Sequence, residues 1–169
     1  YPDNGPRIDV PNGSRIYLKS DAMEFSESEN NNTLRLARKS NDTEYIDFNI
    51  GGYLTSLIRA NNFDEVASIP GSAFYSLFNS QRVISAKNLI TDNIQFVDRH
   101  SFAYCFYNTP IIELPDGMFE NVISTDDESF LNCFIACGSL ETLPTGMFKN
   151  VKIAMILTNF YRLAEIDLQ

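Results

Sequence analysis

Tryptophan is absent from this chain, histidine occurs once, and cysteine occurs three times in 169 residues. So few cysteines exclude a disulfide-rich scaffold, because such scaffolds carry many cysteines in a short chain. We expect all three cysteines to be small buried thiols: Cys105, Cys133 and Cys137. A zinc site needs more His and Cys ligands than one close cysteine pair offers. The sequence therefore predicts no metal and no cofactor.

Basic residues are also scarce, with 13 Lys and Arg against 22 Asp and Glu and a formal charge of −9. Nucleic acids and anionic membrane surfaces are bound mainly through Lys and Arg, so neither is an expected partner. No apolar run approaches the ~20 residues of a membrane helix, so we expect no membrane insertion of this chain. Because the chain begins with Tyr1 rather than Met, we expect that a signal or lipid anchor has been removed upstream.

No pattern of catalytic residues stands out. His100 has no nucleophile and orienting acid beside it, and the cysteines lie in the most apolar part of the chain, away from groups that lower a thiol pKa. The acidic run at 126–128 lacks the alternating ligands and the glycine of a calcium loop, so we expect a solvated connection there. We therefore predict no enzyme activity and no catalytic residue.

What the sequence does contain is an internal repeat. An aromatic segment recurs in 28-residue steps, and an apolar doublet follows each copy. The aromatic positions are Phe74 with Leu77 and Phe78, Phe102 with Cys105 and Phe106, and Phe130 with Cys133 and Phe134. The doublets are Val83 and Ala86, Ile111 and Leu114, Leu140 and Leu143, and Leu163 and Ile166. A repeat of this length is one supersecondary unit that buries its apolar side only by stacking on its neighbours.

The unit has the size of a leucine-rich-repeat coil, in which a short strand is followed by a turn and a return segment. Pro115 and Pro144 would end the strands, because proline has no N–H for a ladder hydrogen bond. The "DGMF" and "TGMF" that follow predict a glycine turn and a short helical return. We therefore expect a mainly β fold with short helical segments, arranged as a right-handed leucine-rich-repeat solenoid over residues 61–169.

Two segments of the repeat, "AYCFYNTPIIELPDGMF" and "LNCFIACGSLETLPTGMF", resemble the BspA-type leucine-rich repeats of surface proteins in Bacteroides and related bacteria. The match to that pattern rests on Phe134, Cys137, Leu140, Leu143 and Pro144. The preceding copy departs from it, because Asn108 or Thr109 falls where Cys137 stands. The resemblance implies an extracytoplasmic protein, at the cell surface or secreted, that acts in adhesion.

Residues 1–60 show a different periodicity of apolar residues. The stretches "SRIYLKS", "NTLRLARKS" and "TEYIDFNI" alternate apolar with polar residues, which predicts half-buried strands, and the short link "SND" favours antiparallel pairing. Gly51 and Gly52 offer a turn or a bulge. We expect this region to form an antiparallel β cap over the first repeat, with an independent binding module as the alternative.

In stacked repeats, the residues between the two core positions of each strand line up into a broad face that commonly binds partners. The predicted face comprises Ile84, Ser85, Ile112, Glu113, Glu141, Thr142, Ala164 and Glu165. We expect it to bind a host or bacterial surface protein. A glycan-binding accessory protein is the alternative, with Tyr104 and Tyr107 as candidate stacking residues, and a hydrolase would need two carboxylates converging in a cleft.

Overall fold

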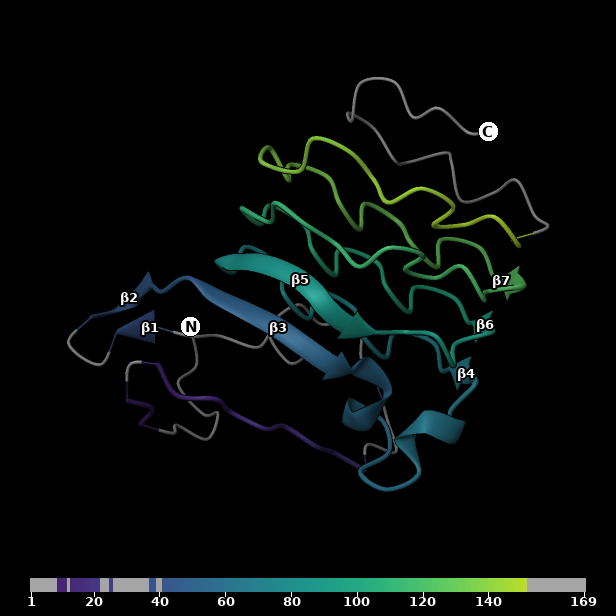
Figure 1. The fold of residues 1–169 in the computed structure, drawn as a ribbon, viewed down its shortest axis with the longest axis horizontal. Coiled ribbons are helices and arrows are strands. Elements are labelled where there is room, and N and C mark those ends of the chain that lie inside the picture. Colours follow the sequence, from purple (N-terminus) through teal and green to yellow (C-terminus); the bar gives the residue numbers. More distant parts are fainter. Residues whose placement is uncertain (1–8, 12, 22–24, 26–36, 39–40, 152–169) are drawn as a thin grey trace.

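The computed structural model describes residues 9–11, 13–21, 25, 37–38 and 41–151, and its strands form three small sheets. In chain order the elements are β1 (Ala37–Arg38), β2 (Asn41–Tyr45), β3 (Phe48–Tyr53), the 3-10 helices η1 (Leu54–Leu57) and η2 (Phe63–Glu65), β4 (Ser68–Ile69), β5 (Val83–Ile90), β6 (Phe96–Val97) and β7 (Ser124–Thr125). After β4 the chain runs back and forth in successive layers that stack toward its C-terminal end (Figure 1).

Each layer contains a turn segment, and the three turn segments, at 72–80, 100–108 and 128–136, are built in the same way. Every second backbone N–H closes a tight turn onto the carbonyl three residues earlier, as Tyr75 does onto Ser72 at 3.2 Å. In the first two segments the alternate N–H groups donate to the next layer, as that of Phe74 does to the carbonyl of Ser101 at 2.8 Å. Neighbouring layers are therefore joined by a backbone ladder at alternate residues.

The turn segments also share an unusual backbone conformation. The dihedral φ is positive at every fourth residue, and the equivalent positions recur 28 residues later. These residues are Ser72, Ser76, Ser80, His100, Tyr104, Asn108, Glu128, Asn132 and Ala136. Residues other than glycine are uncommon at positive φ, so the surrounding hydrogen bonds must hold these residues in place. A helix cannot pass through such a segment, because it needs consecutive residues in the right-handed region.

Two columns of phenylalanine rings form the centre of the core. Phe74, Phe102 and Phe130 lie over one another with ring centroids 5.1 and 5.2 Å apart. Phe78, Phe106 and Phe134 form the second column at 5.3 and 5.4 Å. All six rings are buried. Because each layer contributes one ring to each column, a layer covers its apolar face only against its neighbours.

Parallel strands mark two other parts of each layer. β4, β6 and β7 pair in parallel register, and their arrows lie one above the other in Figure 1. β3 pairs in parallel with β5, and the same column continues into the next layer through a single bridge between Ser85 and Glu113. In the β3 and β5 column, regular strand structure therefore thins out as the layers proceed.

Asparagine side chains tie the layers together where strands are short. The side-chain amide nitrogen of Asn93 donates to the carbonyls of Phe63 and Val66 at 3.1 and 2.7 Å. Asn121 and Asn150, one and two layers on, donate to backbone carbonyls of the layer before. Such bonds satisfy carbonyls that no strand partner reaches, which matters because an unpaired buried polar group is costly.

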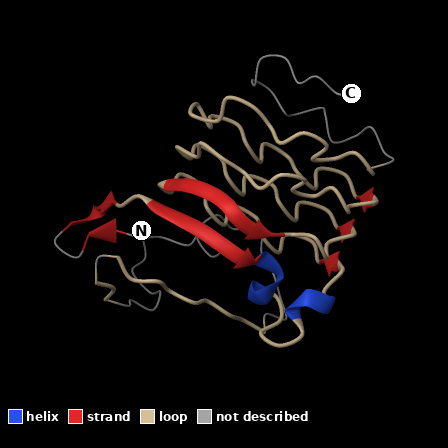
Figure 2. Cartoon of the chain, in the orientation of Figure 1, coloured by secondary structure: helices blue, strands red, loops and turns tan. Residues whose placement is uncertain are grey.

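The predicted right-handed leucine-rich-repeat solenoid with helical returns is wrong. The described chain holds small sheets that are mostly parallel, and its two 3-10 helices, drawn blue in Figure 2, both precede the first turn segment. The sequences "DGMF" and "TGMF" form consecutive turns, with Gly117 and Gly146 at φ of 65° and 72°. The mainly β character alone is compatible with the structure. The helical returns fail because φ is positive at regular intervals along the turn segments, and such a backbone cannot form a helix.

The predicted antiparallel cap is also wrong in its main part. Residues 14–20 form no strand, and much of the second stretch lies outside the described residues. Among the strands that the structure describes, only β1 and β2 pair in an antiparallel manner, whereas β3 joins the layers as a parallel neighbour of β5. The glycine pair lies inside β3, where the register shifts between Asn49 and Gly51 as in a bulge. A Cβ on Gly51 would lie 3.0 Å from the Cβ of Asn88, so glycine permits this close approach.

The phenylalanine columns generate a stability prediction. Phe106 lies at the centre of its column with no exposed surface, so Phe106→Ala should lower the free energy of unfolding by about 3 to 5 kcal/mol. Phe96→Ala is the matched control, since Phe96 is 42% exposed and should cost no more than about 1 kcal/mol. Urea denaturation followed by circular dichroism measures both. Equal losses would contradict the column as the centre of the core.

Candidate functional site

The structure distributes most of the predicted binding face over three successive layers. Ile84 and Ser85 lie on β5, and Ile112 and Glu113 follow one layer later. Glu141 and Thr142 lie in the third layer and are exposed. Ala164 and Glu165 lie outside the described residues. We call Ile84, Ser85, Ile112, Glu113, Glu141 and Thr142 the strand face.

Polar contacts across layers order the strand face. The Ser85 hydroxyl donates to a carboxylate oxygen of Glu113 at 2.6 Å, and Lys87 lies 3.7 Å from the other oxygen. Beside this group, Ile112 is 55% exposed. The face thus combines an exposed apolar side chain with charges of both signs, which is the composition of many protein-binding surfaces.

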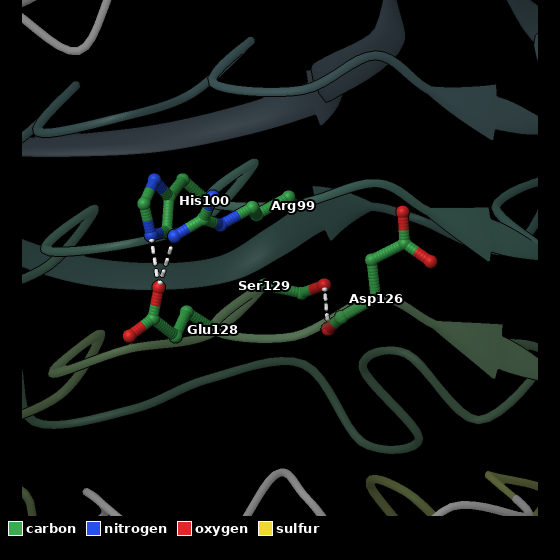
Figure 3. Close-up of polar contacts among 5 residues, drawn as sticks. All are labelled: Arg99, His100, Asp126, Glu128 and Ser129. Carbon is green, nitrogen blue, oxygen red and sulfur yellow. Dashed lines mark hydrogen bonds and ion pairs between the residues drawn. The ribbon is translucent and has the colours of Figure 1, made fainter.

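A second group of side chains gathers on the turn segments of the second and third layers (Figure 3). Glu128 Oε2 lies 3.0 Å from a guanidinium nitrogen of Arg99 and 2.6 Å from Nε2 of His100. The Arg99 hydrogen bond, followed by that of His100, lowers the pKa of Glu128 below its ordinary value. Nearby, the Ser129 hydroxyl donates to the Asp126 carbonyl at 2.6 Å and so helps to fix the start of the third turn segment.

Tyrosine rings extend this group along the turn segments. Tyr75 packs against Tyr104 with ring centroids 5.8 Å apart, and Tyr104 packs against Tyr107 at 5.7 Å. Tyr75 also approaches the His100 ring at 6.4 Å. All three tyrosines are half-buried. We call Tyr75, Tyr104, Tyr107, His100, Arg99 and Glu128 the tyrosine cluster.

The three cysteines are buried free thiols, as the sequence predicts. Burial raises the pKa of each thiol, so the reactive thiolate is disfavoured. The Cys137 thiol donates to the Phe106 carbonyl at 3.0 Å and lies 3.4 Å from the Thr109 hydroxyl. Thr109, and not Asn108, therefore occupies the position of Cys137 in the preceding layer.

Within the described ranges, no three His, Cys, Asp or Glu side chains come together as a metal site would require. In the same part of the chain, no helix is long and apolar enough to cross a membrane. The acidic run at 126–128 is exposed, and of its three residues only Glu128 forms a side-chain ion pair within the described part of the chain.

No protein-family model, no curated protein and no solved structure matches this chain.

Sequence reasoning missed several members of these surfaces. Lys87 is missed because it lies just after the apolar doublet of Val83 and Ala86. Arg99 and Tyr75 are missed because neither residue type recurs at the equivalent position of another copy. One signal was available for Lys87: it lies two residues beyond Ser85, so the two share a side of a strand. The partnership of His100 with Glu128 could have been found from their separation of one repeat.

The buried thiols lead to a chemical prediction. In the native protein, an excess of iodoacetamide should leave all three cysteines unmodified over minutes, because burial disfavours the thiolate. In urea the same reagent should modify all three. Mass spectrometry counts the added groups. Rapid modification of Cys105 or Cys133 in the native state would show that the core is open.

The carboxylate of Glu128 leads to a pH prediction. Because its folded-state pKa is lowered, its contribution to stability is present above its ordinary pKa of 4.5 and is lost as the pH falls through the lower folded-state value. Glu128→Gln should therefore melt below the wild type at neutral pH, and the two Tm values should converge in acid. Thermal denaturation between about pH 7 and 3 tests this.

The matched control for Glu128→Gln is Asp116→Asn, which removes an exposed carboxylate with no ion pair among the described residues. Its Tm difference from the wild type should stay small at every pH. A Glu128→Gln difference that does not change with pH would show that the ion pair is not its source.

Proposed function

We propose that this chain is a non-enzymatic interaction protein of the bacterial cell surface or the secreted space, and that it binds a partner protein through the strand face. Support for the setting comes from the resemblance of its repeated segments to BspA-type surface repeats. Adhesion to a host or bacterial surface protein is the activity that this resemblance favours.

The observation that carries the proposal is the arrangement around Ile112. An exposed isoleucine lies beside a Ser85, Lys87 and Glu113 group whose contacts span two layers. A preordered surface loses little side-chain entropy on binding, and a central apolar anchor with a polar surround is typical of protein interfaces.

Charge favours a neutral or basic partner. Between Ser101 and Asn150 the sequence has seven acids and one lysine, and Glu141 on the strand face is exposed. Such a surface attracts basic patches on a partner and accelerates their encounter.

Binding should be lost when the strand face is changed. The purified chain is screened against immobilised matrix proteins and bacterial surface proteins, and any partner found is titrated with Ile112→Asp and Glu141→Lys variants. We expect Ile112→Asp to weaken binding at least tenfold, because an interface anchor contributes about 1 to 2 kcal/mol or more. Glu141→Lys should also weaken binding, and the loss of affinity should grow as the salt concentration is lowered.

Asp116→Lys is the matched control for Glu141→Lys, since it makes the same charge change at an exposed residue outside the strand face. It should leave the affinity within about twofold, which corresponds to less than about 0.5 kcal/mol. A partner bound equally well by the Ile112→Asp and wild-type chains would place the binding surface elsewhere.

A further inference from the structure

The tyrosine cluster is separate from the strand face, because it lies on the turn segments rather than on the strands. Its members form one continuous series of contacts from Tyr107 through Tyr104 and Tyr75 to His100, and from there to Glu128. The residues come from three successive layers. Stacking, and not closeness in the sequence, brings them together.

Two tyrosine hydroxyls of the cluster are open to a ligand. Among the described residues, the hydroxyls of Tyr104 and Tyr107 have no hydrogen-bonding partner. Buried side-chain atoms left without a partner occur only in Gln81 and Asn93 of the described chain, so these hydroxyls face solvent. Each ring thus offers an apolar surface and a polar tip together.

Glu128 adds a fixed acceptor. Both Arg99 and His100 contact the same carboxylate oxygen, Oε2, and Figure 3 shows the other oxygen directed away from them. Within the described residues this second oxygen has no partner, and the side chain is 44% exposed. Because two contacts already orient the carboxylate, a ligand that donates to it loses little further entropy.

We propose that the tyrosine cluster is a binding site for the pyranose rings of a neutral oligosaccharide. The C–H face of a pyranose carries slight positive charge and packs on the negative face of an aromatic ring. Its hydroxyls both donate and accept, which matches a carboxylate acceptor and tyrosine hydroxyls that do either. Sites for small polar ligands commonly combine aromatic walls with a few fixed polar groups in this way.

The surrounding charge selects against other ligands. Asp98, Asp126 and Asp127 are exposed just before the second and third turn segments begin, so a sulfated sugar, a uronate or a nucleic acid would be repelled. A proline-rich peptide also packs on aromatic rings, but its proline residues lack backbone N–H groups to donate to Glu128. A neutral sugar fits both the rings and the carboxylate.

The test uses the whole chain and a matched pair of sugars, an uncharged galactose tetrasaccharide and the corresponding galacturonate, with neutral glucose and mannose tetrasaccharides alongside. Because the chain has no tryptophan, tyrosine fluorescence reports binding directly. We expect at least one neutral sugar to bind with a Kd near or below about 1 mM, and the galacturonate to bind at least tenfold more weakly.

Variants then place the sugar on the cluster. Tyr104→Ala should weaken binding about tenfold or more, and Tyr104→Phe should lose less, because it keeps the ring and removes only the hydroxyl. Glu128→Gln should weaken binding severalfold while the chain stays folded by circular dichroism. Tyr17→Ala is the control, since Tyr17 is 83% exposed and makes none of the ring contacts of the cluster.

Absence of binding to every neutral sugar at about 10 mM would overturn the proposal, as would wild-type affinity in Tyr104→Ala or a loss in Tyr17→Ala. A preference for the galacturonate would also contradict it. None of these outcomes bears on the strand face, whose protein partner is tested with different variants.

Discussion

The structure depends on how backbone N–H groups are divided within each turn segment. Alternate groups close turns inside the layer, and the groups between them donate to the carbonyls of the next layer at 2.8 to 3.1 Å. This division fixes the length of the repeat. A single inserted residue would exchange the N–H groups that close turns with those that donate to the next layer. The doublet of the third copy, Leu140 and Leu143, follows that of the second by 29 residues, so the third copy contains one extra residue. This residue enters after the last ladder bond, from Asn108 to Ile135, where the division has ended.

Other features of the molecule follow from the same register. The phenylalanine rings fall into columns because they occupy positions whose N–H groups face the next layer. The strand face owes its contact between Ser85 and Glu113 to a separation of one repeat, and the tyrosine cluster owes its contact between His100 and Glu128 to the same separation. Both candidate surfaces thus result from the same stacking that covers the apolar rings.

The two surfaces suit different ligands for physical reasons. Ile112 exposes an apolar side chain next in the sequence to Glu113, which pairs with Lys87, and a protein partner can match this combination. The turn segments instead present half-buried rings with polar tips beside an oriented carboxylate. The two proposed ligands would therefore bind at different places on the layers.

Part of this arrangement was predictable from the sequence. The recurrence of Phe102, Cys105 and Phe106 one repeat later correctly identifies the core, and the cysteines are buried as expected. The helical return and the antiparallel cap were wrong, since β3 pairs in parallel with β5 and the turn segments contain no helix. Tyrosine and histidine are not residue types from which positive φ would be predicted, but His100 and Tyr104 both adopt it.

The sequence by itself determined the repeat length and the residues that become buried, because apolar side chains at a fixed period can be covered only by neighbouring copies. Only the tertiary structure decided the backbone path and the surfaces. Positive φ at His100 and Tyr104 is unfavourable locally and is held by hydrogen bonds and packing between layers. Those interactions join residues about 28 positions apart, so they exist only once the layers have stacked.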